Sequence, residues 1–140
     1  MDEKDRIIID ILLKNARIPY TDIAKKLGVS ETAVRKRIKK LEKERIIEGY
    51  TIKVNPSRLG YKSIAHVGID TEPGHFLGVA CRLTEMEEIK CVAITSGSNM
   101  IVADIWAKNN KHLSEIINKV SKIEGVVAAH PTIIVEMLKS

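Results

Sequence analysis

A short stretch near the start of the chain, Thr21–Lys43 (TDIAKKLGVSETAVRKRIKKLEK), constrains the fold most. Its apolar residues recur at spacings that place them on one face of each of two helices, and a Leu-Gly-Val turn separates the two. Ser30 is a good N-cap for the second helix, and Gly28 suits the unusual backbone angles of a tight turn. The stretch therefore predicts a helix-turn-helix.

The outward face of the second predicted helix is almost entirely cationic. Between Glu31 and Glu42 the chain has no acidic residue and five basic ones, which are Arg35, Lys36, Arg37, Lys39 and Lys40. A face that serves only solubility usually mixes the two signs, because i,i+4 ion pairs then stabilise the helix. We therefore interpret this face as a surface for the DNA major groove rather than as an ordinary solvated face.

The distribution of charge separates the two halves of the 140-residue chain. Residues 1–60 carry fifteen Lys and Arg against nine Asp and Glu, whereas residues 61–140 carry eight against nine. A polyanion would be attracted to the first half only. Aromatic residues make up 4% of the chain, which argues against a surface that stacks single-stranded bases.

The first half is predicted to be a winged helix-turn-helix. Asp2–Asn15 has the apolar stripe of a first helix, and Thr21 is expected to cap the helix that follows. Apolar residues alternate toward the end of Ile46–Val54, which predicts a two-stranded wing, or a short strand and return, beside the helices. Pro56 and Gly60 are expected to end regular structure. The expected division is therefore a DNA-binding domain over 1–54, a linker over 55–61 and a second domain over 62–140.

The second half alternates between strand and helix periodicity. Strands are predicted over 63–71, 89–95, 100–107 and 126–138, with helices over 76–83 and around 113–120. The order β-α-β-β-α-β is that of a ferredoxin-like α+β domain, an antiparallel sheet with both helices on one face. The open face is expected to carry some of Val67, Ile69, Val92, Ile94, Val102, Ile105, Trp106, Ile133 and Val135. Because large open apolar faces mark interfaces, we expect a dimer formed sheet to sheet.

Several functional classes find no support in the sequence. The N-terminus is charged without a following apolar run, and no apolar run is long enough to span a membrane, so we expect a cytoplasmic protein without membrane contact. Neither the two cysteines nor the four histidines have metal-ligand spacing. With no nucleophile-base pair and no phosphate loop, we expect neither catalytic residues nor a metal or cofactor.

The chain resembles the Lrp/AsnC (feast/famine) family, and in particular its archaeal members. The resemblance is carried by the segment SETAVRKRIKKLE, by IIEGYTIKVNP after it, and by the β-α-β-β-α-β pattern that follows. The resemblance covers nearly the whole chain, from Asp2 to about Leu138. It implies a transcription regulator that binds double-stranded DNA, forms a homodimer and often closes into an octamer. The second domain, known in the family as RAM, frequently binds an amino acid that changes assembly or DNA affinity.

The resemblance also implies roles for residues of the second helix. Four residues in its N-terminal part are expected to approach base edges, namely Ser30, Thr32, Arg35 and Lys36. Four further cations are expected to contact phosphates, namely Arg37, Lys39, Lys40 and Lys43. Arg can read guanine through two hydrogen bonds, whereas Lys mostly supplies charge that does not depend on sequence.

For the effector, the resemblance points to the turn between the second and third strands. The family pattern there is Gly-x-x-Asp, but this chain has Met100 in place of the acid. Either other groups meet the ligand ammonium, or the chain binds its ligand differently or not at all. The expected effector-binding residues are Ser96, Gly97, Ser98, Asn99, Met100, His130 and Thr132.

The sequence is also compatible with two other functions. An architectural protein that wraps DNA would have the same cationic face, because phosphate contacts dominate affinity in either case. A minor branch with a similar fold decarboxylates haem precursors with histidines of the sheet domain, a part that His66 and His130 could play here.

Overall fold

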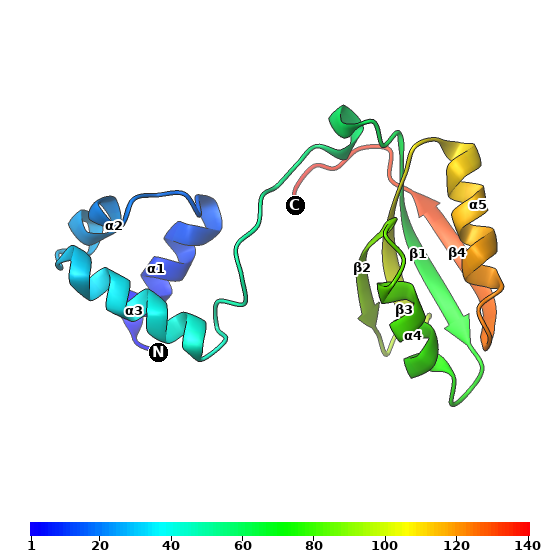
Figure 1. The fold of residues 1–140 in the computed structure, drawn as a ribbon, viewed down its shortest axis with the longest axis horizontal. Helices are drawn as coiled ribbons and strands as arrows, with labels where there is room; N and C mark the ends of the chain where they lie inside the picture. The colour runs from blue at the N-terminus through cyan, green and yellow to red at the C-terminus, as the bar shows by residue number, and fades with distance from the viewer. The chain divides into compact units, whose positions relative to one another are not determined.

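The computed structural model describes residues 1–140, and its internal contacts divide the chain into two compact units (Figure 1). Unit 1 is Met1–Lys53 and unit 2 is Val54–Ser140. No helix in either unit is long and apolar enough to cross a membrane, since the longest, in unit 1, has 13 residues.

Unit 1 consists of the helices α1 (Glu3–Lys14), α2 (Tyr20–Leu27) and α3 (Glu31–Lys43). The predicted helix-turn-helix is confirmed in α2 and α3. Gly28 follows α2 with a left-handed φ of +65°, and the Ser30 hydroxyl oxygen accepts a hydrogen bond of 3.1 Å from the Ala33 N–H at the start of α3. The expected cap at Thr21 is wrong, because α2 begins one residue earlier, directly after Pro19.

The three helices bury their apolar stripes against one another. Ile8 of α1 and Ile23 of α2 are fully buried, and α3 contributes Val34, Ile38 and Leu41, none more than 2% exposed. Since these α3 residues follow each other at i, i+4 and i+7, they form a single stripe. The opposite side of α3 therefore takes no part in the core.

The predicted wing is absent from the structure. Residues 46–54 form no strand, and the side chains of Tyr50, Ile52 and Val54 are exposed. The alternation is present in the sequence, but a strand satisfies its backbone N–H and C=O groups only by pairing with another strand. Unit 1 contains no strand with which this segment could pair.

A short 3₁₀ helix, Pro56–Leu59, lies where regular structure was expected to stop. The Asn55 side chain accepts a hydrogen bond from the Ser57 N–H, and Pro56 occupies the first helical position, where no N–H is needed. Gly60 ends the turn with a φ of +98°. The breaker residues thus begin and end one helical turn.

Unit 2 has the predicted β-α-β-β-α-β order. Its elements are β1 (Ser63–Thr71), α4 (Phe76–Thr84), β2 (Ile89–Ile94), β3 (Ile101–Ala107), α5 (Asn110–Ser121) and β4 (Val126–Ile133). The sheet is antiparallel with the order β2-β3-β1-β4, and α4 and α5 cover one face of it (Figure 1). The ferredoxin-like α+β fold is therefore confirmed.

The last strand is shorter than predicted. It ends at Ile133 rather than at Leu138, and the Ile134 N–H donates one further hydrogen bond of 2.8 Å to the Ile64 carbonyl. Because β1 begins at Ser63, later residues of the chain have no strand beside them to pair with. Val135 is accordingly 97% exposed.

The open face of the sheet differs from the one expected. Val67, Ile69 and Ile105 are fully buried and belong to the core under the helices. Strand register places Val92, Ile94 and Ile133 on that same covered side. Only Val102 and Trp106 of the expected set lie on the open face, because periodicity separates two faces without saying which one the helices cover.

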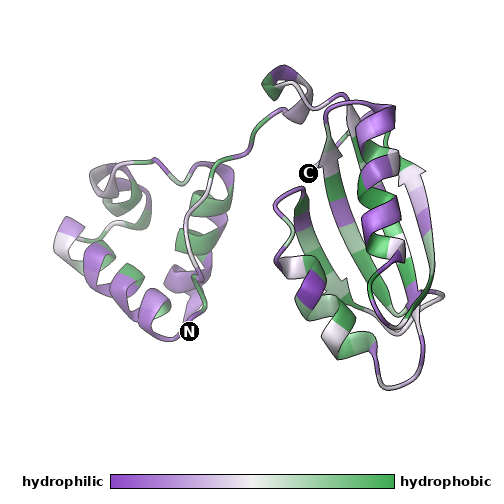
Figure 2. Cartoon of the chain, turned by 45° about the vertical axis from the view of Figure 1, so that its right-hand side comes forward, coloured by the Kyte–Doolittle hydropathy of each residue, from purple (hydrophilic) through white to green (hydrophobic).

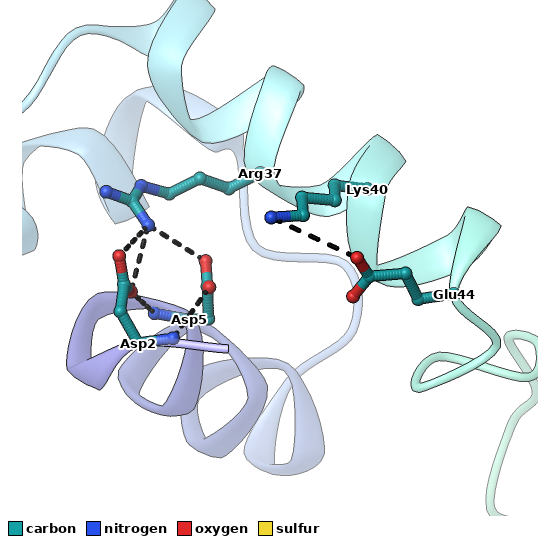
Figure 3. A network of polar contacts seen from close by, with 5 residues as sticks. All are labelled: Asp2, Asp5, Arg37, Lys40 and Glu44. Carbon is teal, nitrogen blue, oxygen red and sulfur yellow. Dashed lines mark hydrogen bonds and ion pairs between the residues drawn. The ribbon is translucent and has the colours of Figure 1, made fainter.

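An ion-pair cluster joins α1 to α3 (Figure 3). Asp2 and Asp5 form a capping box at the start of α1, and the Arg37 guanidinium donates hydrogen bonds of 2.7–3.0 Å to both carboxylates. The hydrogen bond from Arg37, followed by that from the Asp5 N–H, lowers the pKa of Asp2 to about 2. The same contacts raise the pKa of Arg37. We call this cluster the Arg37 clamp.

The clamp predicts a specific acid sensitivity. A carboxylate whose pKa is depressed in the folded state stabilises the fold above its unfolded pKa and loses that contribution as the pH falls through its folded pKa. For Asp2 the window runs from 3.8 down to about 2. We expect Asp2→Asn to lower the midpoint temperature of unfolding at neutral pH. Between pH 3.8 and about 2, the midpoint of this variant should fall less with decreasing pH than that of the wild type. Thermal unfolding followed by circular dichroism measures both effects.

The matched control for this prediction is Asp10→Asn, which removes an exposed carboxylate from the same helix. We expect Asp10→Asn to keep the wild-type dependence of the midpoint on pH. Identical pH profiles for Asp2→Asn and the wild type would mean that the clamp does not stabilise the folded chain.

Candidate functional site

The outer side of α3 is a continuous cationic surface. Hydrophilic colouring predominates along this helix in Figure 2. A shallow groove along it is lined by Ala33, Lys36, Arg37, Lys39, Lys40 and Lys43. All the predicted phosphate-binding residues, together with Lys36, therefore lie along one side of one helix.

The cations of this groove differ in how far carboxylates neutralise them. Lys36, Lys39 and Lys43 are exposed and have no ion-pair partner. Lys40 lies 3.9 Å from Glu44, and both side chains are largely exposed, so this pair is weak. Arg37 is 28% exposed and bound to two carboxylates of the clamp. The free positive charge is therefore carried by the lysines.

The N-terminal part of α3 presents the predicted base-contacting residues. Ser30 and Thr32 are exposed, and the Ser30 hydroxyl can still donate while its oxygen caps the helix. The Arg35 guanidinium is held between the Glu31 carboxylate at 3.0 Å and the ring of Tyr20, whose centroid is 5.1 Å away. Sequence reasoning missed Tyr20, because no local spacing connects it to Arg35.

In unit 2 the structure brings two of the predicted effector residues together. The Asn99 side-chain amide donates a hydrogen bond of 3.1 Å to one oxygen of Asp70, and the His130 ring lies 3.1 Å from the other. Asp70 was not predicted as a site residue. The alternation of residues along β1 predicts the sheet face on which Asp70 lies. Its neighbours do not follow from that alternation, because His130 comes from the paired strand β4 and Asn99 from the turn between β2 and β3.

The remaining predicted effector residues do not reach Asp70. Met100 is half-buried against the core, where its sulfur accepts a hydrogen bond of 3.4 Å from the Thr71 hydroxyl. Thr132 lies opposite His66, whose ring instead contacts Asp104 at 2.8 Å. Ser96, Gly97 and Ser98 are exposed in the turn. No group of three histidine, cysteine or carboxylate side chains could hold a metal ion.

Both units match models of known domain families. Residues 1–42 match the AsnC-type helix-turn-helix domain, and residues 64–140 match the Lrp/AsnC ligand binding domain. The HTH-type transcriptional regulator LrpA of Pyrococcus abyssi is 54% identical over 140 residues, which is 99% of each chain. This relative, matched over nearly its whole length, is a transcriptional regulator.

Solved structures show the same architecture. The structure of AsnC from E. coli superposes with a TM-score of 0.88 at 27% identity and covers 100% of this chain and 95% of that one. A feast or famine regulatory protein from M. tuberculosis, complexed with L-methionine, superposes with a TM-score of 0.91 at 24% identity, covering 99% and 95%. The domain matches, the LrpA identity and this shared fold agree, and the chain belongs to the Lrp/AsnC family of transcriptional regulators.

Proposed function

We propose that this regulator binds specific DNA sequences as a homodimer, with α3 in the major groove, and that an amino acid bound by unit 2 changes its assembly or its DNA affinity. The observation that carries the DNA-binding part is the row of lysines on the outer side of α3, of which Lys36, Lys39 and Lys43 have no carboxylate partner and Lys40 has a weak one. Lysines that are not neutralised within the protein release counterions when they meet phosphates.

Within α3 we assign sequence reading to the N-terminal part. Ser30, Thr32, Arg35 and Lys36 would approach base edges, and Arg35 can form two hydrogen bonds with guanine. In the free chain, Glu31 and Tyr20 restrict the Arg35 side chain. A side chain that is already oriented loses less conformational entropy on binding.

Phosphate contacts fall to Lys39, Lys40 and Lys43. We remove Arg37 from the predicted phosphate set, because its guanidinium already donates to Asp2 and Asp5. Its proposed role is to hold α3 against α1. Phosphate contacts of this kind position the protein on the duplex but do not read its sequence.

The homodimer would form through the open face of the sheet. Ile64, Val102 and Trp106 are half-buried there within one chain, and the Trp106 ring packs against Tyr61 at a centroid distance of 5.7 Å. A two-fold axis through this face would bring two copies of α3 to two half-sites of DNA, with residues 55–61 as the linker on each side. We further propose assembly of such dimers into an octamer in the cytoplasm.

The effector part is supported by the family to which unit 2 belongs. Its model is that of a ligand binding domain, and the M. tuberculosis protein of the same fold was complexed with L-methionine. A ligand that binds one assembly better than another shifts the equilibrium between them. An amino acid bound to unit 2 would act in this way.

An architectural role, in which the protein wraps DNA of any sequence, is the alternative that shares the same cationic surface. Selection of binding sites from a pool of random duplexes discriminates the two, with non-specific competitor DNA present throughout. A sequence-specific regulator enriches one motif, arranged as two half-sites about one helical turn or a multiple of it apart. Recovery of the pool without enrichment would support the architectural role.

Two substitutions in α3 separate sequence reading from phosphate binding. Arg35→Ala should reduce the preference for the selected motif over a scrambled duplex by about tenfold or more, because it removes a contact to a base. Lys39→Ala should weaken binding to both duplexes alike and lower the slope of log affinity against log salt by about one. Fluorescence anisotropy titrations at several salt concentrations measure both quantities.

The control for this pair is Lys119→Ala, which removes an exposed lysine from α5 in unit 2. Its affinity and salt slope should equal those of the wild type. The assignment of roles would be wrong if Arg35→Ala and Lys39→Ala had the same effect on the preference for the motif.

The dimer is tested by placing a charge on the open face. Val102→Glu should convert the protein to a monomer, because an unpaired carboxylate inside an apolar interface costs several times the thermal energy. Leu77→Glu adds the same charge on α4, where Leu77 is 60% exposed, and should leave assembly unchanged. Sedimentation velocity distinguishes monomer, dimer and octamer in one experiment. A Val102→Glu variant that sediments like the wild type would exclude this interface.

A further inference from the structure

We propose that Glu31 reads DNA sequence together with Arg35, so that each half-site contains a guanine for Arg35 and, in the neighbouring base pair, a cytosine for Glu31. Tyr20 positions the Arg35 side chain for this contact. The inference rests on the proposed binding of α3 in the major groove and specifies two adjacent base pairs of the DNA that it binds. It starts from an acidic residue that stands among the base-contacting residues of α3.

Glu31 is an anion at a place where DNA is expected to lie. It is the first residue of α3, directly after the Ser30 N-cap, and the helix has no further acid until Glu42 in its last turn. The N-terminal residues of a recognition helix are those that contact base edges. A carboxylate here suits the helix dipole in the free chain, but DNA phosphates repel it. Glu31 therefore weakens binding unless a base offers it a hydrogen-bond donor.

Few groups in the major groove can meet a carboxylate. The donors there are the N4 amino group of cytosine and the N6 amino group of adenine, whereas guanine presents two acceptors and thymine an acceptor and a methyl group. Adenine also presents its N7 acceptor beside the amino group, and this acceptor would face the carboxylate. Cytosine presents a donor alone. A carboxylate held in the groove therefore selects cytosine.

The bond between Glu31 and Arg35 determines where this cytosine lies. The Arg35 guanidinium donates one hydrogen bond of 3.0 Å to Glu31 Oε1. Of its five N–H groups, two suffice for guanine, so this bond can persist on DNA. The second carboxylate oxygen of Glu31 accepts no hydrogen bond within the chain. Because stacked base pairs are about 3.4 Å apart, side-chain ends 3.0 Å apart reach neighbouring base pairs.

Tyr20 restricts the other side of the guanidinium. This residue opens α2 and is half-buried against the core of unit 1, and its ring centroid lies 5.1 Å from Arg35 Cζ. A guanidinium over an aromatic face is attracted by the ring and keeps the N–H groups at its edge for other acceptors. With Glu31 on one N–H and the ring on one face, few orientations of Arg35 remain. Tyr20 is thus a positioning residue that acts through Arg35.

Selection of binding sites from random duplexes, run in parallel for the wild type and Glu31→Gln, tests the proposal on the full chain. The wild type should enrich a guanine with a cytosine in the neighbouring base pair of each half-site. Glutamine has the shape of glutamate without its charge and reads adenine through N6 and N7. Glu31→Gln should therefore keep the guanine and exchange the cytosine for adenine. The same cytosine in both motifs would overturn the proposal.

Fluorescence anisotropy with four duplexes that differ only at this position gives the size of the effect. The wild type should bind the cytosine duplex about fivefold or more tightly than the adenine duplex, and Glu31→Gln should reverse this order. The two side chains of the pair are 52% and 48% exposed, and such surface pairs contribute little to folding. A purely structural role of Glu31 would lower the affinity for all four duplexes by one factor, which would overturn the reading of cytosine.

Glu42→Gln is the matched control, because it removes the other exposed carboxylate of α3 at the far end of the helix. It should keep the wild-type order of the four duplexes. The same exchange of cytosine for adenine in Glu42→Gln would indicate a general effect of charge and would overturn the assignment to Glu31.

Tyr20→Leu tests the positioning role. This variant keeps an apolar side chain against the core but lacks the aromatic face, and it should lower the preference for the guanine of Arg35 by about threefold or more. Tyr20→Phe retains the ring and should restore the preference. Equal preference in Tyr20→Leu and the wild type would overturn the role of Tyr20.

The selection experiment also separates this inference from the proposed function. If the wild type enriches no motif, sequence-specific binding fails, and the reading of bases by Glu31 and Arg35 fails with it. If the wild type enriches a motif that Glu31→Gln shares, sequence-specific binding stands and this inference alone is overturned.

Discussion

The burial of one narrow apolar stripe on α3 is the constraint on which unit 1 depends. Val34, Ile38 and Leu41 each contribute roughly 1.5–3 kcal/mol when they leave water. Repulsion between like charges at i,i+4 on the outer side costs only about 0.2–0.5 kcal/mol per pair. Burial therefore determines how α3 is oriented, and the helix tolerates a row of lysines that face outward together. The same stripe that stabilises the unit thus exposes the cationic surface.

The Arg37 clamp adds direction to this apolar contact. Burial of the stripe sets which side of α3 faces the core, and the clamp adds a polar contact at one point of the helix. One guanidinium nitrogen of Arg37 donates to both carboxylates of the capping box and so ties α3 to the start of α1. One cation of α3 thereby holds this helix against α1. Counting the charges of α3 in the sequence overestimates the charge that a phosphate would meet.

Local patterns predicted those parts of the structure that depend on neighbours in the sequence. Helix periodicity, the Ser30 cap and the Gly28 turn each involve residues within a few positions, and all were predicted correctly. The prediction of a wing was wrong, because alternation within Ile46–Val54 carries no information about a partner strand. The prediction of which residues lie on the open face failed for a related reason. The side of the sheet that is covered depends on where α4 and α5 pack.

The group of residues around Asp70 in unit 2 was predicted only in part, because local patterns do not relate residues that are distant in the sequence. The turn around Asn99 follows from its position between two strands, but its partner Asp70 is 29 residues away and His130 is 60 residues from Asp70. Only the register of the sheet relates such positions. Met100 stands where the family pattern has an acid, and the fold brings a carboxylate of β1, Asp70, beside Asn99. A family pattern read along one segment can thus miss a group that another segment provides.

The Arg37 clamp also has a practical consequence for work with this protein. Because Asp2 is bonded to α3 through Arg37, whatever precedes Asp2 in a recombinant chain leaves the fold beside the recognition helix. A histidine tag fused there would compete for the clamp or cover the lysines, and a basic tag would add contacts to DNA that the protein does not make. The residues after Ile134 leave the sheet unpaired, so a tag attached to them leaves the Arg37 clamp intact.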